Sequence, residues 1–297
     1  MLEHLSTEKR NNKTMHLDEM SIREILQTMN EEDFTVAAAV AKEIVQIEKL
    51  VQSVVTSFQK GGRLIYIGAG TSGRLGILDA VECPPTFGTN PEMVQGLIAG
   101  EMKAFTKAVE GAEDSEELGV EDLKKIGVNE NDTVIGIAAS GRTPYVIGGL
   151  KYASSVGAST GSISCNKNAK VSQFAHVSVE VETGAEVLTG STRLKAGTAQ
   201  KLVLNMISTA SMIGIGKVYK NLMVDVQSTN KKLVERSKRI IMEATGVQHD
   251  VAESYYDRAH RNVKVAIIMI LLQCEYEEAL EQLNGANGFV KQALQSK

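Results

Sequence analysis

The hydrophobic pattern of this chain changes near residue 61 from a helical period to a strand period. Before that point, apolar residues recur every three or four positions, which predicts helix over residues 21–60. The clearest part of this stripe is Ile44, Ile47, Val51, Val54 and Phe58. Gly61 and Gly62 then end the helix, and the apolar run RLIYI (63–67) predicts the first strand.

Four more β-rich runs follow, separated by segments of helical length. They are VQGLIA (94–99), TVIGIAA (133–139), STGSISC (159–165) and HVSVEV (176–181). Strands that alternate with helices predict an α/β protein, with helices covering both faces of a parallel sheet. Ligands of such sheets bind beyond the carboxyl ends of the strands, so the residues found there are the first candidates for a site.

The last third of the chain is predicted to be helical. A long helix is expected over residues 198–220, and a separate all-helical pattern begins near residue 236. Gly246, Asn262 and Gly285 divide this pattern into three short helices. We therefore expect an α/β domain with N-terminal helices over residues 1–235 and a small all-helical module over residues 236–297.

Charge and composition argue against several classes of function. The chain has 32 basic and 36 acidic residues and a net charge of −4, whereas a nucleic-acid surface needs a basic excess. Its three cysteines lack paired spacing, and its polar N-terminus lacks an apolar signal core, which predicts a reduced, cytoplasmic protein. The longest apolar run, residues 265–272, is too short to span a bilayer. We expect neither a nucleic-acid nor a membrane partner.

The first strand leads into a glycine-rich loop that matches the dinucleotide-binding pattern G-x-G-x-x-G through Gly68, Gly70 and Gly73. That function needs a second strand ending in an acidic residue about 20 positions later. Here the corresponding stretch is CPPTFGTNPE, and its three prolines are incompatible with a central strand. A nicotinamide or flavin cofactor is therefore disfavoured.

A second loop resembles the first and suggests a phosphate instead. Both IYIGAGTSGR (65–74) and IGIAASGRTP (135–144) are apolar strands that run into a Ser-Gly-Arg loop with hydroxyls where a helix begins. Free N–H groups at helix starts bind anions, and hydroxyls add donors. The alternative is that these residues are ordinary helix caps. The candidate phosphate-binding residues are Gly70, Thr71, Ser72, Ser140, Gly141 and Thr143.

Four longer stretches carry a resemblance to a known family: residues 61–88, 108–115, 136–150 and 184–206. Together they resemble the bacterial N-acetylmuramic acid 6-phosphate etherases, within the larger group of sugar-isomerase domains. The last stretch is also similar to a signature shared with the glucokinase regulatory protein. The resemblance implies a three-layer, flavodoxin-like α/β fold that binds a phosphosugar in residues 1–235, and it implies a homodimer.

The reaction that the resemblance implies removes D-lactate from the 3-position ether of N-acetylmuramic acid 6-phosphate, in cell-wall amino-sugar catabolism. It leaves N-acetylglucosamine 6-phosphate. The aldehyde of the open-chain sugar makes the C2 hydrogen acidic, so a base can remove it and lactate can then leave from C3. This chemistry needs a base, an acid and a phosphate anchor, and it needs neither a metal nor a cofactor. The five scattered histidines show no metal-binding spacing.

The resemblance assigns the acid to Glu82, as proton donor, and the second catalytic position to Glu113, which we interpret as the base at C2. Without the resemblance, neither glutamate would be singled out as a catalytic residue. Glu113 lies in an acidic run typical of a solvated surface, and Glu82 has the position of a surface residue at a helix end, which Pro84 supports.

A straight helix over residues 72–82 would place Glu82 about 15 Å from the phosphate loop, too far for one phosphosugar. Either the helix breaks early or Glu82 serves the site of a neighbouring subunit. We expect the second arrangement, with the site near the interface of a homodimer.

Two basic residues lie within the final matching stretch, and the sequence leaves two roles open for each of them. Arg193 and Lys195 are candidates for neutralising the lactate carboxylate or the phosphate, and equally for pairing with Glu186 as structural partners. Two other functions on the same fold are alternatives to the etherase reaction: an aldose–ketose isomerase and a non-catalytic phosphosugar sensor. Both are disfavoured, because the match extends beyond the phosphate loops and includes both glutamates.

Overall fold

The computed structural model describes residues 5–107, 109–226 and 230–295. Within them the chain forms two compact units. The first contains the described residues up to Val81 together with Glu92–Ser208, and the second contains Glu82–Pro91 and the described residues from Thr209 onward. The domain boundary predicted at residue 235 stays a prediction.

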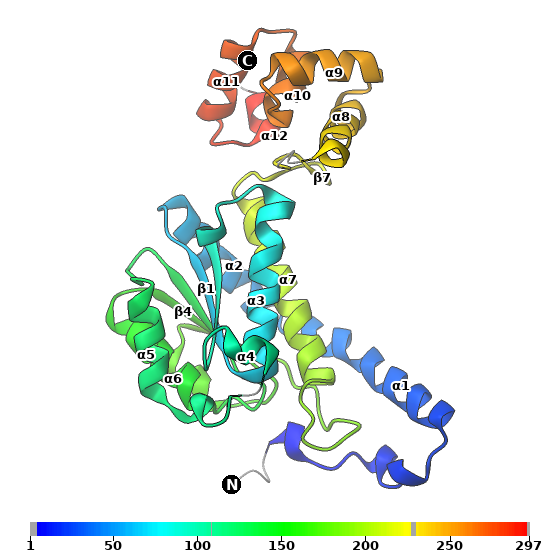
Figure 1. Ribbon diagram of the computed structural model, residues 1–297, viewed down its shortest axis with the longest axis vertical. Helices are drawn as coiled ribbons and strands as arrows, with labels where there is room; N and C mark the ends of the chain where they lie inside the picture. Colours follow the sequence, from blue (N-terminus) through cyan, green and yellow to red (C-terminus); the bar gives the residue numbers. More distant parts are fainter. Residues whose placement is uncertain (1–4, 108, 227–229, 296–297) are drawn as a thin grey trace. The chain divides into compact units, whose positions relative to one another are not determined.

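A five-stranded parallel sheet forms the centre of the first unit (Figure 1). Its strands are β1 (Leu64–Gly68), β2 (Val94–Ile98), β3 (Thr133–Ile137), β4 (Ser159–Ser164) and β5 (Val177–Glu180). They lie in the order β2-β1-β3-β4-β5, and each falls within the run predicted for it or one residue beyond. The order reverses direction between β1 and β3, which is where ligands bind in sheets of this kind.

Helices cover both faces of this sheet, which confirms the predicted three-layer α/β class. The helices before β5 are α1 (Ile22–Ala41), α2 (Ile44–Gln59), α3 (Gly70–Phe87), α4 (Lys103–Thr106), α5 (Glu116–Lys125) and α6 (Pro144–Ser155); α7 (Lys195–Gly214) follows it. Figure 1 shows α5 and α6 on one side of the sheet and α2 and α3 on the other. Short 3-10 turns occupy Ser6–Glu8, Asn12–Thr14, Leu17–Glu19, Pro91–Met93, Ala112–Asp114 and Lys170–Phe174.

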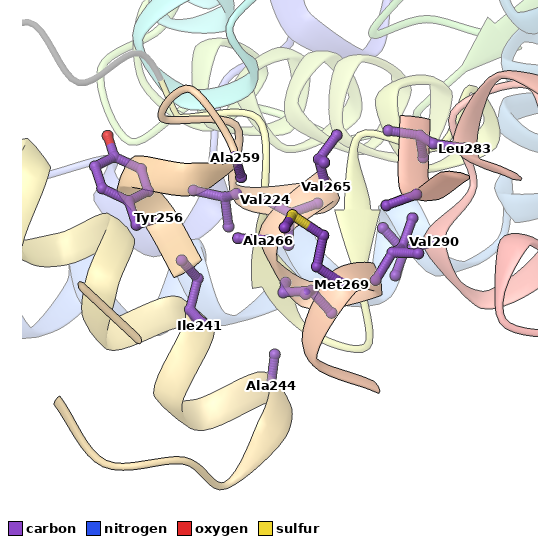
Figure 2. Packing of buried hydrophobic residues seen from close by; sticks show 14 of the residues in the cluster. Val224, Ile241, Ala244, Tyr256, Ala259, Val265, Ala266, Met269, Leu283 and Val290 are labelled. Atoms are coloured by element: carbon purple, nitrogen blue, oxygen red, sulfur yellow. The ribbon is translucent and has the colours of Figure 1, made fainter. Parts of the chain in front are cut away.

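The second unit is mainly helical, as the sequence predicts for the end of the chain. Its elements after α7 are the hairpin β6 (Val218–Tyr219) and β7 (Leu222–Met223), then α8 (Lys231–Thr245), α9 (His249–Arg258), α10 (Val263–Leu272), α11 (Tyr276–Gly285) and α12 (Val290–Ala293). Figure 2 shows Val265, Ala266 and Met269 packed among side chains of the neighbouring helices. Nine of the ten residues of α10 are apolar, and the exception, Lys264, pairs with Asp225, so this helix forms the centre of the core.

The breaks predicted in this region are confirmed by the helix ends. Gly246 adopts a left-handed conformation at the end of α8, the Asn262 side chain accepts from Val265 N at the start of α10, and Gly285 is the last residue of α11. The number of helices was wrong: five replace the expected three. The helix expected over 198–220 ends at Gly214, because Gly216 takes a φ of 79° and the chain then enters the β6–β7 hairpin.

The structure also corrects the predicted end of α3 at Glu82. The helix continues to Phe87 with Pro84 and Pro85 inside it, so the early break considered from the sequence does not occur. The prolines remove the two hydrogen bonds that would reach the carbonyls four residues earlier. Burial of Cys83 and Phe87 offsets this loss, and Gly88 ends the helix with a φ of 62°.

Two glycines allow α3 to lie directly on the sheet. A Cβ atom added to Gly96 of β2 would lie 2.6 Å from the backbone of Ile77 in α3. One added to Gly76 of α3 would lie 2.9 Å from the Cβ of Tyr66 in β1. Both distances are shorter than real Cβ contacts, so any larger residue would push α3 away from the strands.

We expect Gly96→Ala to lower the free energy of unfolding by about 1–3 kcal/mol, because the added methyl meets rigid helix backbone. The measurement is urea unfolding followed by circular dichroism. Gly285→Ala is the control: the space around Gly285 is open and it lies in a helix, so this change should be neutral or stabilising by up to about 1 kcal/mol. Wild-type stability in Gly96→Ala would contradict the close contact.

Candidate active site

The first phosphate loop is a tight turn between β1 and α3. Gly70 has a φ of 53°, and a Cβ atom on Gly68 would lie 2.8 Å from the backbone nitrogen of Gly73. Glycine is therefore required where the loop folds back onto itself. The free N–H groups of the first turn of α3 lie at the carboxyl end of β1, in the position expected of an anion site.

The two hydroxyls of this loop have different surroundings. Thr71 is partly exposed, whereas Ser72 is buried and donates its hydroxyl hydrogen to Oε1 of Gln200 on α7, at 3.0 Å. No local sequence pattern marks Gln200 as a site residue. Its Nε2 is buried and has no hydrogen-bond partner among the described residues. Thr71 is thus the more accessible of the two predicted phosphate-binding hydroxyls.

The second phosphate loop lies beside the first, because β3 pairs with β1 so that Ile137 lies opposite Gly68. Gly141 adopts a φ of 73°, and Ser140 is partly exposed. Thr143 precedes α6, yet its side chain makes no capping hydrogen bond. The alternative that Thr143 is an ordinary helix cap therefore does not explain its hydroxyl group.

A segment from the beginning of the chain braces this second loop. Asn166, which follows β4, is buried, and its side chain makes four hydrogen bonds within the described residues. Its Oδ1 accepts from Ser6 Oγ and Thr7 N, at 3.0 and 3.3 Å. Its Nδ2 donates to Thr7 Oγ1 and to the carbonyl of Ala139, at 3.0 and 3.1 Å. Asn166 thus connects the N-terminal segment to the residue directly before Ser140.

A cavity of about 300 Å³ opens next to the first loop and contains one of the two predicted catalytic glutamates. It is lined by Ala69, Gly70, Arg74, Ala99, Ala104, Val109, Glu110, Gly111 and Glu113. Glu113 lies in a single 3-10 turn that begins after Gly111, whose φ is 76°, and its side chain is exposed. The structure therefore brings Glu113 and the start of α3 to the same cavity.

Glu82 is not among the residues that line this cavity. Its side chain is exposed, and it lies five residues before Phe87, the last residue of α3. Twelve residues of continuous helix separate Gly70 from Glu82, an axial rise of about 18 Å. Along α3, Glu82 is therefore as far from the first loop as a straight helix requires. Its role as proton donor stays a prediction.

Glu186 and Lys195 form part of a buried charge network. Glu186 is fully buried and accepts from the backbone N–H groups of Lys195 and Ala196 at the start of α7, each at 2.9 Å. Burial raises the pKa of Glu186, while these two hydrogen bonds lower it. Lys195 Nζ instead binds Glu32 of α1 at 2.5 Å, and Lys13 also pairs with Glu32. The Lys195 ammonium is thus paired with Glu32, whereas the sequence suggested Glu186 as its partner; its role in ligand binding stays a prediction.

Arg193 is exposed and lines a different, smaller cavity of about 150 Å³, together with Asp33 and Met29. It does not line the cavity that contains Glu113. No cluster of three or more histidine, cysteine or acidic residues in the described ranges is arranged to hold a metal ion. Nor does any helix in that part of the chain have the length and apolar content needed to cross a bilayer.

A second buried carboxyl group joins three elements behind the first loop. Asp79 of α3 accepts from Tyr66 Oη of β1 at 3.0 Å, and from Asn205 Nδ2 and Ser208 Oγ of α7 at 2.7 and 3.1 Å. Burial raises the pKa of Asp79, and these three hydrogen bonds oppose the rise. Asp79 therefore fixes α3 against β1 and α7.

Two protein families match the part of the chain that forms these loops. The glucokinase regulatory protein N-terminal SIS domain matches residues 46–154, and the SIS domain matches residues 107–210. Among solved structures, a phosphoheptose isomerase from Francisella tularensis is 11% identical, with a TM-score of 0.50, over 65% of this chain and 100% of that chain. This last likeness concerns the fold alone.

Curated proteins match the chain from end to end. An N-acetylmuramic acid 6-phosphate etherase of Bacillus cereus strain G9842 is 80% identical over 99% of this chain and 100% of its own length. One of the same name from Bacillus mycoides strain KBAB4 is 79% identical over the same shares of the two chains. The similarity therefore includes both phosphate loops, both glutamates and the helical C-terminal region.

The Asp79 contacts predict a pH dependence of stability. Folding raises the pKa of Asp79, so the carboxyl group binds a proton more tightly in the folded chain than in the unfolded chain. In the unfolded chain the pKa of an aspartate is about 3.9. The free energy of unfolding of the wild type, relative to Asp79→Asn, should therefore fall as the pH rises from about 4 through the raised pKa. Urea unfolding of both proteins at several pH values measures this difference, and a constant difference would contradict the assignment.

Proposed function

The chain belongs to the N-acetylmuramic acid 6-phosphate etherases and is a carbon–oxygen lyase of that family; from this premise, we propose how its residues perform the reaction. The substrate is N-acetylmuramic acid 6-phosphate, and the products are N-acetylglucosamine 6-phosphate and D-lactate. The observation that supports the proposal is that Glu113 and Gly70, at the start of α3, line the same cavity, because the reaction needs a base close to a bound phosphate.

The phosphate is held where the two loops meet. The first turn of α3 supplies N–H donors from Gly70 and Thr71, and the Thr71 hydroxyl adds another donor. Ser140, Gly141 and Thr143 approach from the adjacent strand end. Ser72 joins them once its hydroxyl turns away from Gln200. Anchoring the phosphate fixes C2 and C3 relative to the catalytic groups, which removes much of the entropic cost of the reaction.

Elimination then proceeds at C2 and C3. The Glu113 carboxylate takes the C2 proton of the open-chain sugar, and the electron pair of that bond forms the C2–C3 double bond. The C3–O bond breaks with its electrons going to the ether oxygen, which takes a proton from the Glu82 carboxyl group. Water then adds its oxygen to C3 while the Glu82 carboxylate takes one of its protons. Glu113, whose proton has exchanged with solvent, protonates C2, so the product forms and both glutamates return to their starting states.

Glu82 acts in the site of a neighbouring subunit in this proposal. The continuous α3 helix supports that arrangement, because its 18 residues leave Glu82 far along the axis from the loop of its own chain. The protein is accordingly a homodimer with its site near the subunit interface, and it works in the cytoplasm in amino-sugar catabolism. The end-to-end identity to etherases favours this function over sugar-phosphate isomerisation and over a non-catalytic sensor.

The function is tested by incubating the purified protein with N-acetylmuramic acid 6-phosphate in D₂O and assaying D-lactate. We expect stoichiometric lactate and one deuterium at C2 of the sugar product, because the proton that returns to C2 comes from solvent. Tight phosphosugar binding without lactate release would exclude the enzymatic function. Product that keeps only its original C2 hydrogen would exclude elimination followed by hydration.

The position of Glu82 is tested by mixing two inactive chains, Glu82→Gln and Glu113→Gln. Hybrid dimers contain one site with both glutamates intact only if the two residues of a site come from different chains. We then expect about a quarter of wild-type activity from an equal, randomly exchanged mixture, since half of the dimers are hybrids and each has one complete site of two. Each homodimer alone is the control, and no recovery after verified exchange would contradict action between chains.

A further inference from the structure

The cavity beside the first phosphate loop contains one basic side chain among its described lining residues, and that residue is Arg74. It lies one turn into α3, so its position is fixed by the same helix that begins the phosphate site. The other charged residues of the lining are Glu110 and Glu113. A cation in an otherwise acidic cavity suggests that an anionic group of the ligand lies there.

The contacts of Arg74 leave one edge of its guanidinium available. Its Nε donates to the carbonyl of Phe105 at 2.9 Å, and its Nη2 donates to the carbonyl of Ala104 at 2.7 Å. These two bonds use the edge formed by Nε and Nη2 and hold the plane of the group against α4. The edge formed by Nη1 and the second hydrogen of Nη2 has no partner among the described residues.

That edge matches a carboxylate. A guanidinium presents its N–H groups as a planar fork, which a carboxylate accepts through both oxygens. The two carbonyls that hold Arg74 are neutral, and no ion pair to it is formed within the described chain. The two basic residues considered from the sequence are less suited, since Lys195 is buried against Glu32 and Arg193 lines another cavity.

We propose that Arg74 binds the lactyl carboxylate of the substrate through its Nη1–Nη2 edge and so distinguishes the ether substrate from the product. This inference rests on the proposed function, because it concerns the substrate of that reaction. The lactyl carboxylate is attached to the carbon that bears the ether oxygen. Holding it against Arg74 orients the ether oxygen while Glu113, in the same cavity, removes the C2 proton. The product sugar lacks this carboxylate and so does not use the Arg74 edge.

The experiment compares wild type with Arg74→Met and Arg74→Lys, and it uses Lys103→Met as a matched control. Lys103 is an exposed cation at the start of α4 that does not line the cavity. Steady-state assays give kcat/KM on N-acetylmuramic acid 6-phosphate, and calorimetry gives the Kd of N-acetylglucosamine 6-phosphate, which has the phosphate but no lactyl group.

We expect Arg74→Met to lower kcat/KM by about 100-fold and Arg74→Lys by about 10-fold, because lysine keeps the charge but not the planar fork. The Kd of N-acetylglucosamine 6-phosphate should change by less than about twofold in both variants, since losing one charge pair affects only the ligand that makes it. Lys103→Met should match the wild type in both measurements.

Equal losses for substrate and product would overturn the proposal, because they would mean that Arg74 acts only by holding α4. Unchanged kcat/KM in Arg74→Lys and Arg74→Met would overturn it as well. If Arg74→Met does not fold, Arg74→Lys alone decides, since it retains a donor for the carbonyl of Ala104. A wild-type protein that releases no lactate would instead refute the proposed function, so the two failures are distinct.

Discussion

The direct contact of α3 with the sheet is the constraint on which the site depends. At Gly76 and Gly96 there is no room for even a methyl group, so the helix axis is fixed relative to β1 and β2. The first turn of α3 is fixed with the helix, and Arg74 follows one turn later in the cavity that Glu113 also lines. Asp79 holds the same helix to α7 through Asn205 and Ser208. The proposed phosphate site and the Arg74 side chain thus share one rigid support.

Most of the fold is predictable from the sequence because its signals are local. The five strands are short apolar runs bounded by turn residues, and each was located to within two residues. The positions of the two glycine- and hydroxyl-containing loops are also predictable, since such residues directly after buried strands have a direct physical meaning; their binding of phosphate stays a prediction. Glu113 was identified only through a family resemblance, because an exposed glutamate within an acidic run looks the same whether or not it is catalytic.

What the sequence did not reveal depends on contacts between distant residues. Ser72 is bound by Gln200, and Lys195 is bound by Glu32, although 128 and 163 positions separate the partners. No local pattern marks such pairs. The extension of α3 through Pro84 and Pro85 has the same origin, since burial of Phe87 outweighs the local preference to end the helix. Arg74 is visible in the sequence as part of a Ser-Gly-Arg loop, but only its bonds to the carbonyls of Ala104 and Phe105 show which edge of its guanidinium is left without a partner among the described residues.

The brace formed by Asn166 has a consequence for biosynthesis. Thr7 is synthesised 159 positions before its partner Asn166. At about 5–20 residues per second, Thr7 and Ser6 must wait roughly 8–30 s before these hydrogen bonds can form. Once it has been synthesised, the loop around Ser140 is likewise without its support until Asn166 follows. This loop therefore reaches its final structure late in synthesis, only after most of the sheet has been made.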